Sequence, residues 1–188
     1  MEQIRANFEK TTPLSDADWL LFCSRLEEVN FKKKALLLTA GQTENYLYFI
    51  QKGITRFYIP QEADDLTFGF TFQDNFVSAY DSFLTQTPST YCVEALTNVA
   101  AWRVSYSDMQ AIYTQSQTGN AIGRHAGEAL FLEKTKREIS LLKDTAQQRY
   151  LALFKEQPQL LQHIPLKFIA SYIGITPQAL SRIRKRIT

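Results

Sequence analysis

The chain carries the segment Pro165-Leu-Lys-Phe-Ile-Ala-Ser-Tyr-Ile-Gly-Ile-Thr-Pro-Gln-Ala-Leu-Ser-Arg-Ile-Arg-Lys-Arg-Ile-Thr188. Its apolar residues recur at helical spacing on both sides of Gly174, which can supply a sharp turn. Thr176 followed by Pro177 is typical of a helix N-cap with proline at the first helical position. The segment therefore predicts a helix, a short turn and a second helix.

Charge is distributed unevenly along the chain. The sequence has 21 lysines and arginines against 19 acidic residues, so the net charge is only +2. No acidic residue lies between Gln157 and Thr188, whereas five of the basic residues do. A helix-turn-helix lays its second helix in the major groove, where basic side chains meet phosphates and polar ones meet base edges. Duplex DNA is therefore the first predicted partner. The alternatives are a solvated helix or one that docks on an acidic protein.

The second helix of this segment has two unlike faces. Leu180, Ile183 and Ile187 share one side, which is suited to packing. The other side is polar and basic, and it can meet DNA. The candidate DNA-binding residues are Lys167, Thr176, Gln178, Ser181, Arg182, Arg184, Lys185 and Arg186.

Composition places the remainder of the chain among globular proteins. A hydrophobic fraction of 45% is enough for a core in one large or two small domains. No run approaches the roughly 20 apolar residues of a membrane span, and no signal region follows Met1, so we expect a cytoplasmic protein without a membrane partner. Cys23 and Cys92 lack metal-ligand spacing and are expected to be buried free thiols.

Upstream, the hydrophobic period changes twice. Ser15-Asp-Ala-Asp18 resembles a capping box, and the aromatic and aliphatic residues after it predict a helix of about 14 residues that reaches Val29. From Ala35 to about Val104 a period of two predicts strands, with Tyr46–Ile50 and Ile54–Ile59 as a hairpin. Tyr91–Leu96 and Val99–Val104 are expected to form a second pair.

These strands predict an antiparallel sandwich or barrel, which either encloses a small-molecule pocket or is filled by its own aromatic side chains. Helical spacing then returns. A long helix is expected from about Asn120 to Lys143, with Glu133/Arg137 and Lys134/Glu138 as ion pairs, and a further helix at Asp144–Glu156. The long helix is a candidate connector and dimer seam, or else packs on its own domain. The candidate seam residues are Ile122, Ala126, Ala129 and Leu130.

In this order of elements, nearly the whole chain resembles the Crp/Fnr family of bacterial transcription regulators. The similarity is carried by Tyr48–Arg56, by Phe76–Leu96, and by Gln148–Tyr150 together with Ile169–Lys185. It implies an α+β fold with three parts. These are a cyclic-nucleotide-binding-like β-roll (a double-stranded β-helix) with flanking helices at 1–117, a connecting and dimerisation helix at 118–143, and a helix-turn-helix DNA-binding domain at 144–188.

The resemblance further implies a homodimer that binds a near-palindromic DNA site through the helix at 177–187. RNA polymerase is a further candidate partner. Residues 76–90 correspond to the family's phosphate-binding cassette, where a Gly-Glu pair and an arginine hold the cyclic phosphate. Here Ser78 and Ala79 stand at the pair, and Ser89 or Thr90 at the arginine. Hydroxyls cannot replace a bidentate guanidinium, so we expect no tight binding of cyclic AMP.

An effector, if the protein has one, is unidentified. The polar residues expected to border the old pocket are Tyr80, Asp81, Ser82, Ser89 and Thr90. The alternative is a filled roll without a ligand. Two cysteines cannot hold an iron–sulfur cluster, and His125 and His163 are the only histidines available to a haem or a metal, so no cofactor is predicted.

A second hypothesis is a small-molecule-binding, cupin-like receptor that does not bind DNA. Metal catalysis of the cupin type is not expected, because no histidine precedes Arg124. No catalytic constellation at a recognisable spacing appears either, so the chain is not predicted to be an enzyme.

Overall fold

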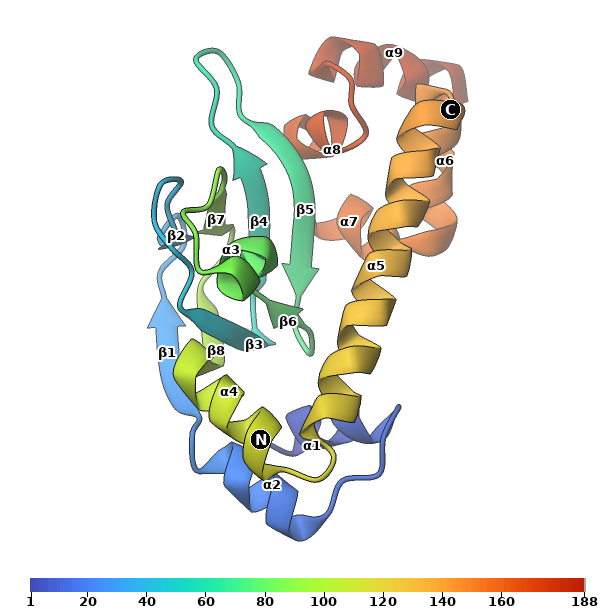
Figure 1. Ribbon diagram of the computed structural model, residues 1–188. Helices are drawn as coiled ribbons and strands as arrows, with labels where there is room; N and C mark the ends of the chain where they lie inside the picture. Colours follow the sequence, from blue (N-terminus) through green and yellow to red (C-terminus); the bar gives the residue numbers. More distant parts are fainter. Residues whose placement is uncertain (188) are drawn as a thin grey trace.

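The computed structural model describes residues 1–187, which form a β-roll joined by a long helix to a set of shorter helices (Figure 1). The strands of the roll are β1 (Glu27–Phe31), β2 (Leu36–Leu38), β3 (Tyr46–Lys52), β4 (Ile54–Ile59), β5 (Leu66–Phe72), β6 (Phe76–Val77), β7 (Cys92–Ala95) and β8 (Val99–Ser105). The helices are α1 (Glu2–Glu9), α2 (Asp16–Cys23), α3 (Tyr80–Thr85), α4 (Tyr106–Gln115), α5 (Gly119–Lys143), α6 (Ala146–Glu156), α7 (Pro158–His163), α8 (Leu166–Tyr172) and α9 (Pro177–Ile187).

The strands form two four-stranded antiparallel sheets. The strand orders are β1-β8-β3-β6 and β2-β7-β4-β5. Most strands that are consecutive in the chain therefore lie in opposite sheets, and the two inner faces pack on one another around Tyr48, Ile50 and Val93. This confirms the predicted class, α+β with an antiparallel roll followed by helices.

The two hairpins expected from the sequence are wrong in their pairing, although all four strands exist. β3 pairs with β8 and β6, whereas β4 pairs with β5 and β7. The chain crosses between sheets at Gly53, whose φ of +106° favours glycine, and a Cβ at this position would lie 2.4 Å from the Asn98 carbonyl oxygen. The chain crosses between the sheets a second time between β7 and β8. The two crossings are in contact, since the Ile54 N–H donates to Thr97 Oγ1 over 3.0 Å. These residues make corners where hairpin turns were predicted.

The helix predicted to reach Val29 is also too long. α2 ends at Cys23, and Val29 lies in β1 opposite Ala101 of β8. The apolar spacing here is compatible with helix or strand, and pairing with a neighbouring strand decides the outcome. Ser15 does cap α2 by accepting from the Asp18 N–H, but the Asp18 carboxylate turns away from it.

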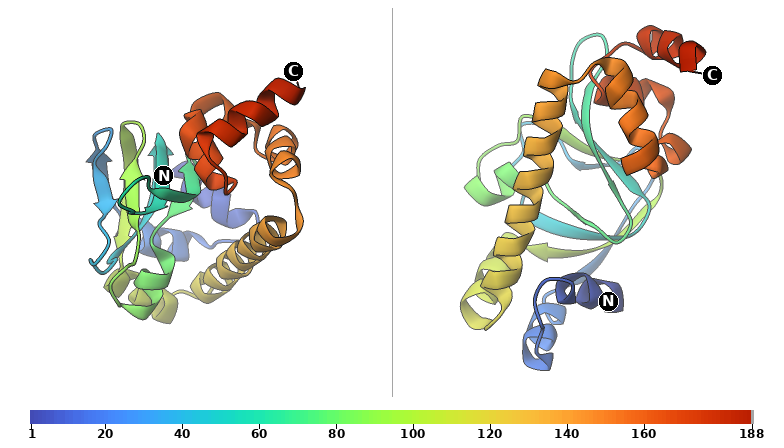
Figure 2. Two further views of the ribbon diagram at one scale, coloured as in Figure 1. Left: turned by 90° about the horizontal axis from the view of Figure 1, so that it is seen from above. Right: turned by 90° about the vertical axis from the view of Figure 1, so that its right-hand side faces the viewer.

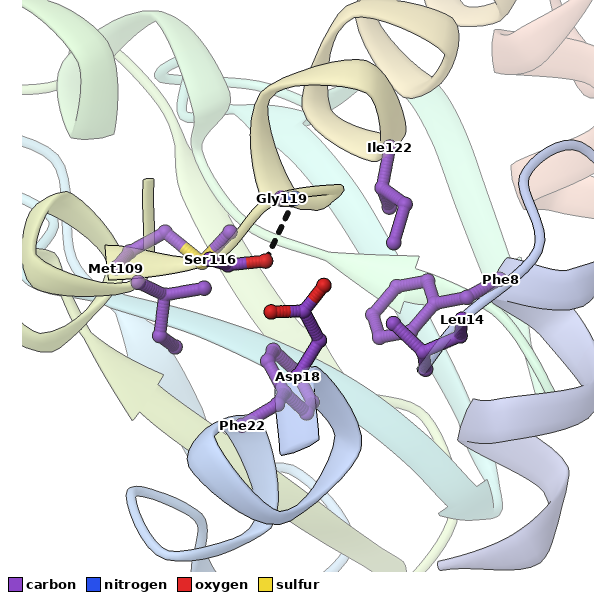
Figure 3. A pocket seen from close by; sticks show the side chains of 9 residues that line it. Phe8, Leu14, Asp18, Phe22, Met109, Ser116, Gly119 and Ile122 are labelled. Carbon is purple, nitrogen blue, oxygen red and sulfur yellow. Dashed lines mark hydrogen bonds between the residues drawn. The ribbon is translucent and has the colours of Figure 1, made fainter. Parts of the chain in front are cut away.

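Asp18 binds the beginning of α5. Its buried carboxylate accepts from the Gln117 and Thr118 N–H groups over 3.2 Å and from the Thr118 hydroxyl over 2.7 Å. These hydrogen bonds outweigh the effect of burial and lower the pKa of Asp18. Figure 3 shows Asp18 among Phe8, Phe22 and Ile122, beside a cavity of about 20 Å³. That space suits about one water molecule, so it is a packing gap between α2 and α5.

Beyond α5, the chain forms the helix pair and turn that the sequence predicted. Gly174 has a φ of +76° between α8 and α9, and Thr176 Oγ1 accepts from the Ala179 N–H over 3.2 Å as the cap of α9. The helix predicted at Asp144–Glu156 begins later, at Ala146, because Thr145 and Gln148 form a capping box.

The turn at Gly174 gives a test of the helix pair. A Cβ there would make ordinary contacts with Leu141 Cδ2 at 3.6 Å and Arg149 Nη2 at 3.8 Å, so the cost of Gly174→Ala comes from its backbone conformation. We expect thermal unfolding to show a loss of about 1–2 kcal/mol. Gly127→Ala is the control, because its Cβ would meet open space in a helix and should not destabilise. Equal stability of both variants would contradict the assigned turn.

Candidate nucleic-acid interface

The inner side of α9 holds it against the preceding helices. Leu180 is buried in a cluster with Tyr150 and Leu153 of α6 and Ile169 and Ile173 around α8, and Ile183 is half-buried beside them. Ile187, predicted on the same side, is exposed at the end of the helix. The apolar face predicted for this helix therefore packs in its first two turns.

The outer side of α9 lies at the surface. Thr176, Gln178, Ser181 and Arg182 are all exposed, and so are Arg184, Lys185 and Arg186. Lys167 of α8 is exposed as well, with its Nζ 4.8 Å from the centroid of the Phe168 ring. In Figure 1 and in the right view of Figure 2, α9 lies at the margin of the molecule, away from the roll interior. The structure thus gathers most of the candidate DNA-binding residues on one exposed, basic helix.

The inner helix, α8, docks on the roll at strand β5. The Thr67 N–H donates to Ser171 Oγ over 2.8 Å, and Ser171 Oγ donates to the Asp65 carbonyl over 3.2 Å. Phe70 of β5 packs against Tyr172 with ring centroids 5.5 Å apart. Ile54, Phe72 and other residues of the roll belong to the same apolar cluster as α6, α8 and α9. The helix pair and the roll are therefore continuous in their packing.

Arg137 of α5 also takes part in this contact between α8 and β5. The sequence predicted an ion pair with Glu133, but Arg137 binds backbone carbonyls instead. Its Nε donates to the Phe68 carbonyl over 3.2 Å and its Nη2 to the Tyr172 carbonyl over 2.8 Å. The guanidinium carbon lies 4.3 Å from the centroid of the Tyr172 ring. Burial lowers the pKa of Arg137. One side chain thus connects α5, β5 and the end of α8.

Arg56 makes a second link between the roll and α8. It is only 2% exposed, and its guanidinium lies 4.1 Å from the ring centroids of both Tyr58 and Phe168. Asp65 pairs with it at 2.6 Å and Glu94 at 3.7 Å, so the buried charge is compensated. Sequence spacing contained no signal for this contact, because its partners come from β4, the loop before β5, β7 and α8.

The residues predicted to border the old ligand pocket lie on or just after α3. Ser82 accepts from the Glu44 N–H over 3.0 Å, Ser89 donates to the Tyr91 carbonyl over 2.9 Å, and the Asp81 carboxylate accepts from the Tyr91 hydroxyl. Tyr80 stacks on Phe83 with centroids 6.3 Å apart, and Thr90 is exposed. Four of the five predicted pocket residues thus contact other parts of their own chain.

Glu44 is the site residue that sequence reasoning missed. Its side chain is buried beside the start of α3, where the carboxylate accepts from the Tyr46 N–H over 3.0 Å and the Ala79 N–H over 3.5 Å. Burial raises the pKa of Glu44 to about 6, although these hydrogen bonds oppose the shift. A buried acidic group from the loop before β3 therefore lies against the start of the cassette, although a glutamate in a loop is ordinarily solvated.

Glu44 predicts a pH dependence of stability. Its folded-state pKa lies above the unfolded value of about 4.3, so the stabilising contribution of the protonated form is complete below pH 4.3 and is lost as the pH rises through about 6. Glu44→Gln should gain relative to the wild type, by up to about 2 kcal/mol, in denaturant unfolding between pH 4.5 and 7.5. The exposed Glu62→Gln should show no such trend. A difference that is independent of pH would contradict a buried, titrating Glu44.

The long helix α5 has an exposed apolar face. Phe131, Leu132, Ile139 and Leu142 are 69%, 66%, 53% and 83% exposed. Of the predicted seam residues, Ala126 and Ala129 are exposed, Leu130 is half-buried, and Ile122 packs in a core cluster of its own chain with Ile4 and Phe8. The exposed large side chains lie further along the helix than the residues chosen from the sequence.

Three further features complete the description of these residues. Within residues 1–187, no group of three or more histidines, cysteines or carboxylates is placed to hold a metal ion. No helix in this described part of the chain has both the length and the apolar character needed to cross a membrane. Cys92 is buried and Cys23 half-buried, and both are free thiols.

The sequence and fold of this chain are similar to those of known proteins. Residues 28–116 match the sequence family of the cyclic nucleotide-binding domain. No curated protein matches the sequence of the chain. Solved structures share its fold. The c-di-GMP-responsive global regulator CLP of Xanthomonas campestris is 16% identical with a TM-score of 0.69, covering 92% of this chain and 91% of its own.

Two other structures are similar over comparable lengths. A protein of Eubacterium rectale assigned to the Crp/Fnr family of transcriptional regulators is 14% identical with a TM-score of 0.72, covering 93% of this chain and 83% of its own. FixK2 of Bradyrhizobium japonicum is 18% identical with a TM-score of 0.67, covering 86% of this chain and 84% of its own. At these identities the likeness establishes the fold, which in each case extends over most of both chains.

Proposed function

We propose that this protein is a homodimeric transcription regulator of the Crp/Fnr type, which binds duplex DNA through α9. The observation that carries the proposal is the exposed basic side of α9, held outward by the burial of Leu180 on the opposite side. No acidic residue from Gln157 onward opposes its charge. The similar fold of the Crp/Fnr-family protein from Eubacterium rectale supports the same assignment. The division into a roll at 1–117, a connector at 118–143 and a DNA-binding part at 144–188 belongs to this proposal.

The exposed side chains divide by the DNA groups that they can meet. Arg182 can donate to guanine O6 and N7 or to a phosphate, Gln178 can pair with adenine, and Ser181 can reach a base or the backbone. Arg184, Lys185 and Arg186 follow on the last turns of α9, where neutralising phosphates is their most direct role. Lys167 and Thr176 would contact the backbone from α8 and the turn. Two such helices in a dimer would enter successive major grooves about 34 Å apart.

The exposed face of α5 supplies the seam of the proposed dimer. Leu132, Ile139 and Leu142 recur at intervals of seven and three residues, which is the spacing of a coiled-coil stripe. Large apolar side chains exposed together on one helix mark an interaction surface. Phe131 extends the face. The alanines chosen from the sequence lie outside it, since Ala126 is eleven residues before Arg137 and so shares the Arg137 side of the helix. This seam lies on the opposite side of α5 from Arg137.

Cyclic AMP is not the proposed effector. The cassette has no arginine at the position that the family uses, and the nearby buried Glu44 adds a carboxylate, which repels a phosphate, at the start of the cassette. The roll interior is packed with its own side chains, including Tyr48 and Phe57. This packing also weakens the alternative of a cupin-like receptor without DNA binding, which needs an open barrel.

The reading helix gives a test with two different outcomes. Arg182→Ala should weaken binding to a preferred duplex by about 1–3 kcal/mol if the contact is to a base. Lys185→Ala should weaken binding to all duplexes similarly and reduce the salt slope of log K by about 1. Gel-shift titrations over a range of salt concentrations measure both. Lys33→Ala, at an exposed lysine near β1, is the matched control. Unchanged affinity and specificity of the Arg182 variant would count against its role.

The proposed seam is tested separately. Leu132→Glu and Leu142→Glu place a charge on the exposed face of α5 and should convert a dimer to monomers in sedimentation velocity runs. Leu20→Glu is the matched control, because Leu20 is also 67% exposed but lies on α2. A wild-type protein that stays monomeric, or a dimer that survives both α5 substitutions, would exclude this seam.

A further inference from the structure

Strand β5 is an edge strand whose outer side is occupied by side chains from helices. It comes last in the order β2-β7-β4-β5, so one row of its backbone groups has no strand partner. Ser171 of α8 accepts from the Thr67 N–H, and Arg137 of α5 donates to the Phe68 carbonyl. An uncovered edge exposes unpaired N–H and C=O groups. The helices therefore meet the roll through backbone groups that it could not satisfy within its own sheet.

Arg137 fixes the orientation of α8 relative to the roll as well as holding the two in contact. A guanidinium is a planar fork of donors, so binding two carbonyls at once defines their relative orientation more closely than a single ammonium could. Here the two carbonyls belong to Phe68 of the roll and Tyr172 at the end of α8. Ser171 adds two hydrogen bonds from the same turn of α8, one with Thr67 of β5 and one with Asp65 just before that strand. The turn that leads into α9 follows directly after Tyr172.

The same helix carries both this contact and the proposed dimer seam. Lys134, Arg137 and Leu141 share the side of α5 that faces the roll and the helix pair, as shown by their contacts with Phe68, Tyr172 and Gly174. Leu132, Ile139 and Leu142 lie on the other side. An orientation of α9 that is fixed relative to α5 is therefore also fixed relative to α9 of a partner copy.

We infer that Arg137 and Ser171 are positioning residues for DNA recognition, which set the spacing between two half-sites without touching DNA. This inference rests on the proposed function. Each added base pair moves a half-site by about 3.4 Å along the helix axis and rotates it by about 35°. Two rigidly held reading helices accept one spacing. Loosely held reading helices can change their relative orientation and so accept several spacings. Each helix still binds its own half-site, because its reading surface is unchanged.

The experiment compares Arg137→Met and Ser171→Ala with Arg103→Met as the control. Arg103 makes similar contacts away from the helix pair, since it pairs with Glu27 at 3.0 Å and its guanidinium lies 4.1 Å from the Tyr46 ring centroid. The probes are duplexes that carry two copies of the half-site selected by the wild-type protein, with the spacing changed by one base pair at a time. Full-length protein is titrated against each duplex, and hydrogen exchange reports the Thr67 amide.

The wild type and the Arg103 variant should prefer one spacing over its neighbours by about tenfold or more. The Arg137 and Ser171 variants should lose most of this preference, while affinity for a single half-site stays within about twofold. In both, the Thr67 amide should exchange faster than in the control. A merely structural role would lower thermal stability and leave the preference for spacing intact.

The outcomes separate the two claims. If the wild-type protein selects no duplex, the proposed function fails, and this inference fails with it. If the wild type selects a spaced pair of half-sites and the two variants keep the same spacing preference, only the positioning role is overturned. Unchanged exchange at Thr67 in both variants would likewise overturn it.

Discussion

The open edge of β5 is the constraint on which the arrangement of this protein depends. A strand at the end of a sheet needs partners for its outward backbone groups, and here they come from Ser171 and Arg137. An apolar cluster that includes Ile54, Phe70 and Leu180 stabilises the same contact between the roll and the helices. Because the inner sides of α8 and α9 are buried in this contact, the basic side of α9 faces solvent.

The two sides of α5 differ in the contacts that they make. The side that bears Arg137 and Leu141 is used within the chain, and the opposite side exposes Leu132 and Leu142. Its beginning is anchored separately, since the Asp18 carboxylate binds the backbone just before the helix. A helix fixed at its start and joined to both the roll and the helix pair can transmit the position of one to the other. This is the physical basis of the proposed regulator, whether or not it has an effector.

Local patterns predicted some elements well. The spacing of Leu180 and Ile183 predicted the packed side of α9, and Thr176 predicted its cap, because both depend on residues within one or two turns. The strands at Tyr46 and Ile54 were predicted for the same reason. Their partners were not, because strand pairing is decided across the sheet by residues far apart in the chain.

The candidate site shows the same division between local and distant causes. The exposed residues of α9 could be chosen from the sequence, since charge and helical spacing identify them. Glu44 could not, because its burial follows from the position of α3 above the loop that contains it. Arg137 appeared to be one half of an ion pair, and only the nearby carbonyls of Phe68 and Tyr172 give it another role.

We propose that α9 reads duplex DNA as one of a symmetric pair. Selection of bound fragments from a random duplex library by the intact protein tests it most directly, because partner, sequence preference and symmetry are measured together. We expect enrichment of a near-palindromic sequence whose half-sites lie about one helical turn apart. A library that returns unenriched, from a protein that is not retained on duplex DNA even at low ionic strength, would contradict it.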